Sequence, residues 1–140
     1  MAVVINRKIG GLFNMKGEKS NRIIWMAGAF VALFVSFLLC RYVLLGLHGM
    51  KQWPVIMFLF GLIFIVIAAI FDGRKVMICT VAGYIGGFVL GMLFNSYGVD
   101  QGGGRTSNAW KIWTVSFIVI MIAGIVWQLL DKHMKKKKTT

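Results

Sequence analysis

The sequence predicts an all-α fold, an integral membrane four-helix bundle with both tails in the cytoplasm. Hydrophobic residues make up 59% of its 140 residues and charged residues only 14%, a balance too apolar for a soluble domain. The apolar residues gather in four runs, each close to the ~20 residues that cross ~30 Å of hydrocarbon as a helix. The 16 Lys and Arg residues stand against 4 acidic residues and lie mainly outside these runs, so we expect a lipid bilayer as partner and no nucleic acid.

A basic head over residues 1–22 precedes the first apolar run. Its scattered glycines weaken any helix, so a loose tether and a short helix lying on the bilayer surface both remain open. The first span is expected over residues 23–45, because the seventeen residues from Ile23 to Leu39 carry no charge. Arg41 falls in its last turns, where a long side chain reaches the headgroups.

Three further spans follow at short intervals. The second is expected over residues 54–71, where Pro54 suits the first turn of a helix. The third covers residues 76–94, and the tight turn before it makes spans two and three antiparallel neighbours. The fourth covers residues 109–130, and a polybasic tail over residues 131–140 ends the chain.

The distribution of basic residues predicts the orientation. Twelve Lys and Arg residues lie in the head, the tail and the turn after span two, whereas four lie on the other side. The positive-inside rule therefore predicts cytoplasmic tails. Compactness and the absence of glycosylation acceptors in the outer loops favour a bacterial cytoplasmic membrane. The lysines expected to anchor the tail on an anionic cytoplasmic leaflet, at about 1 kcal/mol each, are Lys132, Lys135, Lys136, Lys137 and Lys138.

Aromatic residues agree with this orientation, because Trp and Tyr gather at membrane interfaces. Trp25 and Trp127 are expected at the inner interface. The residues expected at the outer interface are Tyr42, Trp53, Tyr97, Trp110 and Trp113.

Small residues recur every four positions in spans three and one, and positions four apart share one face of a helix. The candidates are Cys79, Gly83, Gly87 and Gly91, with Gly86 beside them, and Gly28, Ala32 and Ser36. In lipid, such a glycine-zipper face lets helices approach closely. We expect helix packing, either within the bundle, where spans one and three could meet, or between chains. Lining of a pore is the alternative.

The loop between spans three and four is a candidate recognition element. Its notable residues are Asp100, Gly102, Gly103, Gly104 and Arg105. Successive glycine N–H groups beside a positive charge are how anion-binding nests are built. A flexible linker is the favoured interpretation, and a regulatory or immunity protein that binds through this loop is a third functional hypothesis.

No Asp, Glu, Lys or His lies in the middle of any predicted span, and proton-coupled carriers require such groups there. His48 and His133 are isolated in the sequence, so we expect no enzyme, cofactor or metal site. The leading hypothesis is a non-enzymatic accessory or assembly subunit that packs through its small-residue faces, as a homo-oligomer or against a larger membrane protein. The alternative is a small oligomeric channel or holin-like pore lined by span three.

Overall fold

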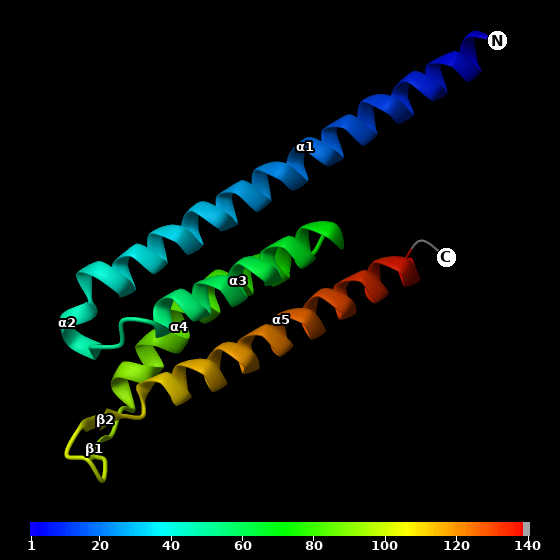
Figure 1. The fold of residues 1–140 in the computed structure, drawn as a ribbon. Helices are drawn as coiled ribbons and strands as arrows, with labels where there is room; N and C mark the ends of the chain where they lie inside the picture. Colours follow the sequence, from blue (N-terminus) through cyan, green and yellow to red (C-terminus); the bar gives the residue numbers. More distant parts are fainter. Residues whose placement is uncertain (139–140) are drawn as a thin grey trace.

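The computed structural model describes residues 1–138, with side chains described outside residues 6–10, 12–16, 105 and 138. It is a bundle of long helices with a small hairpin at one end (Figure 1). The elements are α1 (Ala2–Leu38), a π-helical turn (Leu39–Val43), α2 (Leu45–His48), α3 (Trp53–Ile70), α4 (Arg74–Leu93), β1 (Tyr97–Val99), β2 (Arg105–Ser107) and α5 (Ala109–Lys138). Four of the helices are long and apolar enough to cross a membrane, which confirms the predicted number and composition.

Both chain ends lie at the same end of the bundle, and the β1–β2 hairpin lies at the opposite end (Figure 1). We call these the termini end and the hairpin end. The α3–α4 turn also lies at the termini end, as an antiparallel arrangement of the helices requires (Figure 1).

The first and last helices are longer than the predicted spans. The head, predicted as a tether or a separate surface segment, instead continues α1 from Ala2, and the polybasic tail continues α5 to Lys138. Extending an existing helix adds one hydrogen bond per residue without a new nucleation cost. The roughly 1 kcal/mol penalty of each glycine in the head is therefore tolerated.

At its other end α1 does not continue to Leu45 as one α-helix. The Leu44 N–H donates to the Leu39 carbonyl at 2.8 Å, the five-residue spacing of a π-helical turn. His48 ties this turn to the following loop. Its Nδ1 accepts from the Met50 N–H at 3.0 Å, so its Nε2 carries the proton and donates to the Cys40 carbonyl at 2.6 Å.

The core is centred on α4, which packs against α1, α3 and α5. Large buried side chains from all four long helices meet there, among them Leu33, Met57, Tyr84, Trp113 and Phe117. The outward faces of the same helices remain apolar and exposed, as Ile63, Val115 and Ile118 illustrate. The bundle therefore has an apolar interior and an apolar exterior.

The predicted helical fold is confirmed, with a local exception at the loop between α4 and α5, where β1 and β2 form an antiparallel pair. Tyr97 is opposite Ser107 and Val99 is opposite Arg105, which leaves residues 100–104 as the connection. Asn95 closes the base of this hairpin, because its Oδ1 accepts from the Ser107 hydroxyl at 2.9 Å. The loop predicted as a flexible linker is thus a defined hairpin.

Candidate functional site

The glycine face of α4 is covered by α5 of the same chain. A Cβ built on Gly87 would lie 2.7 Å from Cδ1 and 3.0 Å from the backbone oxygen of Trp113. A Cβ on Gly91 would lie 2.9 Å from the backbone oxygen of Ala109. Both contacts are closer than real Cβ atoms tolerate without a shift, so glycine is required for the two helices to approach this far.

The rest of the predicted stripe follows the same interface, with looser contacts at Gly83 and Gly86 and a close one at Cys79. A Cβ on Gly83 would lie 3.3 Å from Phe117 and Ile120, and one on Gly86 would lie 3.8 Å from Ile120. Cys79 packs against Gly124 of α5, where a Cβ would come within 2.7 Å of the Cys79 Cβ. The stripe therefore faces α5 along most of its length.

This placement corrects the expectation that the small faces of spans one and three meet, because the partner of the α4 face is α5. The sequence signal was the pair Trp113 and Phe117, four residues apart, whose bulk fills the space that the glycines leave. A passage lined by this face would require α4 and α5 to separate. The structure gives no support for the pore hypothesis along the described residues of this face.

Several polar side chains of the four long helices have hydrogen-bond partners within the bundle. The Tyr84 hydroxyl donates to the Pro54 carbonyl at 3.0 Å, and Trp113 Nε1–H donates to the Tyr84 carbonyl at 2.9 Å. Three hydroxyls donate to the carbonyl four residues back, at 2.7 Å for Ser36, 2.8 Å for Thr80 and 2.7 Å for Thr114. These residues are structural, as expected for hydroxyls in apolar helices.

The small face of α1 is divided between the core and an open groove. Ser36 is buried, whereas Gly28 and Ala32 are exposed. The two exposed residues line a groove of about 560 Å³ between α1 and α4, which we call the α1–α4 groove. Its lining is entirely apolar, and no atom lies within 4 Å of a Cβ built on Gly28. The residues that line it are Ile24, Trp25, Gly28, Ala29, Ala32, Met77, Ile78, Val81 and Ala82.

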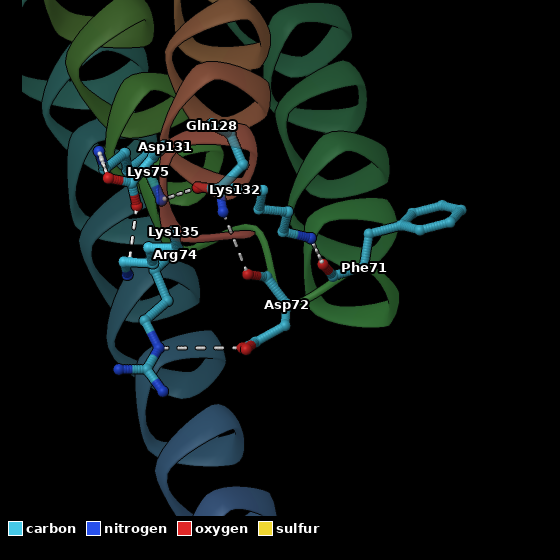
Figure 2. A network of polar contacts seen from close by, with 8 residues as sticks. All are labelled: Phe71, Asp72, Arg74, Lys75, Gln128, Asp131, Lys132 and Lys135. Carbon is cyan, nitrogen blue, oxygen red and sulfur yellow. Dashed lines mark hydrogen bonds and ion pairs between the residues drawn. The ribbon is translucent and has the colours of Figure 1, made fainter. Parts of the chain in front are cut away.

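A polar network at the termini end ties α5 to the α3–α4 turn (Figure 2). Asp131 forms ion pairs with Lys75 at 3.2 Å and Lys135 at 3.3 Å. Gln128 accepts from the Lys75 N–H at 3.2 Å, and Lys132 Nζ donates to the Phe71 carbonyl at 2.6 Å. Lys132 thus satisfies a carbonyl at the end of α3.

The predicted anchoring lysines consequently differ in their surroundings. Lys132 and Lys135 take part in the network, and Lys136 and Lys137 follow them on the last turns of α5; all four side chains are exposed. The side chain of Lys138 lies outside the described residues. The network thus connects the base of the predicted tail to the bundle.

At the hairpin end, the Asp100 carboxylate accepts hydrogen bonds from the glycine N–H groups that an anion-binding nest would offer to a ligand. Its Oδ1 accepts from the Gly102 N–H at 3.0 Å and from the Gly104 N–H at 2.7 Å. Gly103 has φ +78, which favours glycine. The nest interpretation is therefore wrong for Gly102 and Gly104, while the side chain of Arg105 lies outside the described residues.

Replacing Asp100 with alanine is expected to loosen the hairpin tip, since it removes the acceptor of both glycine N–H groups. Amide hydrogen exchange at Gly102 and Gly104 should rise about tenfold, the effect of losing one ordinary hydrogen bond each. Asp100→Asn, whose side-chain oxygen can accept the same bonds, is the matched control. Equal exchange in the wild type and the Asp100→Ala variant would contradict this account of the tip.

The fold and its grooves define a class, that of a small helical protein with four membrane-length apolar helices. Comparison with known protein families, with curated proteins and with solved structures gives no match to this chain. Its function is therefore argued from its own residues.

Proposed function

We propose that this protein is a non-enzymatic, multi-pass membrane protein that acts as an accessory or assembly subunit, and that its α1–α4 groove receives a transmembrane helix. The helix comes from a second copy or from a larger membrane protein. The single observation that carries the proposal is an open apolar groove with small residues on its walls, Gly28, Ala29 and Ala32 from α1 and Ala82 from α4.

Insertion in a membrane is supported by the large apolar surface that the bundle leaves exposed on its outside. Only 17% to 39% of each membrane-length window is buried within the chain, although the windows are apolar throughout. A helix that is apolar on all sides belongs in a large core or in lipid, and 140 residues are too few to cover these faces. The twelve basic residues around the termini end favour its placement in the cytoplasm of a bacterial cell.

A helix is the occupant that suits the α1–α4 groove. Association between helices in lipid depends on close backbone contact, which small residues permit. From Ile24 to Ala32 the α1 wall extends over nine residues, a rise of about 12 Å, which is more than two helical turns. No charged residue lines the groove, so a lipid headgroup or a polar peptide gains nothing there.

The double substitution Gly28→Leu and Ala32→Leu is expected to fill the groove and to abolish association while the bundle stays folded. Open space at Gly28 accepts the new side chain, and leucine is a better helix former than glycine. The affinity of association should fall by at least about tenfold, which is the effect of losing a central contact in an interface. The measurement is particle mass in native nanodiscs, by light scattering or native mass spectrometry.

Val31→Leu is the matched control, because Val31 is 59% exposed on α1 and lies outside the groove. It should leave the mass unchanged. If the wild type is a single chain, the same variants are compared for the membrane proteins that co-purify with them after cross-linking. Wild-type assembly of the double variant would overturn the proposal.

A further inference from the structure

We infer that a second groove, between α3 and α5, binds an anionic phospholipid of the cytoplasmic leaflet, with its phosphate at Lys132 and one acyl chain along the helices. The inference rests on the proposed membrane location. It concerns a different surface from the α1–α4 groove, so the two can be tested apart.

The α3–α5 groove consists of two adjoining hollows of about 260 Å³ each, which share Phe64 and Ile125. The hollow nearer the termini end is lined by Phe71 of α3 and Leu129 of α5, and Val76 of α4 forms part of its wall. The other extends the groove past Phe60 and Ile122 towards the hairpin end. The two hollows therefore lie one after the other along the helix axes, and both open to the outside of the bundle.

The walls of the nearer hollow are almost wholly apolar, and its two polar residues border it where it reaches the termini end. Its polar lining residues are Gln128 and Lys132. The Gln128 amide already has partners within the protein, because its oxygen accepts from the Lys75 N–H and its NH₂ group donates to the Asp72 carbonyl. Lys132 gives one N–H to the Phe71 carbonyl, and a lysine ammonium has three, so it keeps donors for a phosphate oxygen (Figure 2).

The charge around this mouth favours an anion. Asp131 is paired with Lys75 and Lys135, and Asp72 lies 3.8 Å from Arg74. Each of these acidic residues has a basic residue beside it. The four basic residues here outnumber the two acidic ones, and they are Arg74, Lys75, Lys132 and Lys135. A phosphodiester gains both charge and hydrogen bonds at this point.

The groove is longer than one leaflet is deep. Its α5 lining runs from Lys132 to Thr114, eighteen positions or about 27 Å of helix. One leaflet is about half of the ~30 Å hydrocarbon thickness. A headgroup at Lys132 therefore places an acyl chain against apolar wall over the whole depth of its leaflet. An apolar helix would leave the lysine unused, and free phosphate would leave the apolar wall unused.

The test is lipid retention by the delipidated protein in mild detergent, measured by native mass spectrometry. The probes are phosphatidylglycerol, phosphatidylcholine with the same acyl chains, and glycerol phosphate, which has the headgroup chemistry without chains. We expect retention of phosphatidylglycerol well above the other two. Lys132→Gln should weaken it about fivefold, the effect of one basic residue at an anionic surface.

Two further variants make the test specific. Leu129→Trp should block the groove and reduce retention of both lipids. Because Leu129 is 61% exposed, the fold should survive, as an unchanged circular dichroism melt would verify. Lys137→Gln makes the same charge change beyond the groove and should retain phosphatidylglycerol like the wild type.

Equal retention of the two lipids by the wild type, or equal losses in Lys132→Gln and Lys137→Gln, would overturn the inference in favour of diffuse attraction. Glycerol phosphate bound as well as the lipid would overturn it in favour of a simple phosphate site. The double variant Gly28→Leu with Ala32→Leu, which fills the α1–α4 groove, should still retain phosphatidylglycerol in the α3–α5 groove. Wild-type association of this double variant would overturn the helix-binding proposal alone, whereas unselective lipid retention by the wild type would overturn the lipid inference alone.

Discussion

Replacing Gly87 with leucine is expected to prevent α4 and α5 from packing and to destroy the folded bundle. Even the first added carbon would lie 2.7 Å from the Trp113 ring and 3.0 Å from the Trp113 backbone oxygen. The ring could rotate away, but the backbone oxygen moves only if the helix moves. Overpacking costs about 1–3 kcal/mol for smaller insertions, so we expect about that loss for Gly87→Ala and unfolding for Gly87→Leu. Thermal unfolding in detergent, followed by circular dichroism, measures both.

Gly86→Ala is the matched control, one residue away on the same helix. Its Cβ would meet Ile120 at 3.8 Å, an ordinary contact, and alanine is the better helix former. This variant should melt at or above the wild-type temperature. If Gly87→Ala melted together with Gly86→Ala, the glycine face would not be held against α5, and it would again be available to a partner or a passage.

The number of helices and most of their inner limits could be predicted from the sequence because they depend on local features. The exception is the first span, predicted to residue 45, because α1 ends at Leu38 before a π-helical turn. The second span was predicted over residues 54–71 and α3 is Trp53–Ile70, since Pro54 and the end of the apolar run mark its limits. The third was predicted over residues 76–94 and α4 is Arg74–Leu93. The outer limits were missed, because a helix that already exists continues through weak helix formers and lysines alike.

What covers each helix face could not be predicted, because periodicity identifies a face and not its neighbour. Trp113 illustrates this. Its place near the end of a span predicted an outer-interface residue, yet it is 1% exposed and packs on the α4 glycines. Likewise Gly28 and Ser36 share one stripe, but only Ser36 reaches the core. Both grooves depend on the angles and distances at which the helices pack, and these are set by side chains of several helices at once.

Trp113→Ala is expected to be the most destabilising single truncation in the α4–α5 interface. The indole fills the space beside Gly87 and Gly91 and contacts the rings of Tyr84 and Phe88 edge-on, each at 5.2 Å between centroids. It also donates to the Tyr84 carbonyl at 2.9 Å. Removing a buried tryptophan costs about 3–5 kcal/mol, and equilibrium unfolding in mixed micelles measures it. Trp113→Phe keeps most of the ring and should lose about 1 kcal/mol with the hydrogen bond.

Trp110→Ala tests whether Trp113 is a core residue of the α4–α5 interface or, as predicted from the sequence, a residue at the outer membrane interface. Trp110 is 39% exposed, lies nearly one turn earlier on α5 and packs against Trp53 with a centroid distance of 4.9 Å. Its loss should cost far less than the loss of Trp113. Equal costs would mean that Trp113 lies at a lipid interface, as its position in the sequence alone suggests. The glycine face of α4 would then lack its cover within the chain, and the partner helix would have to be sought there and not at the α1–α4 groove.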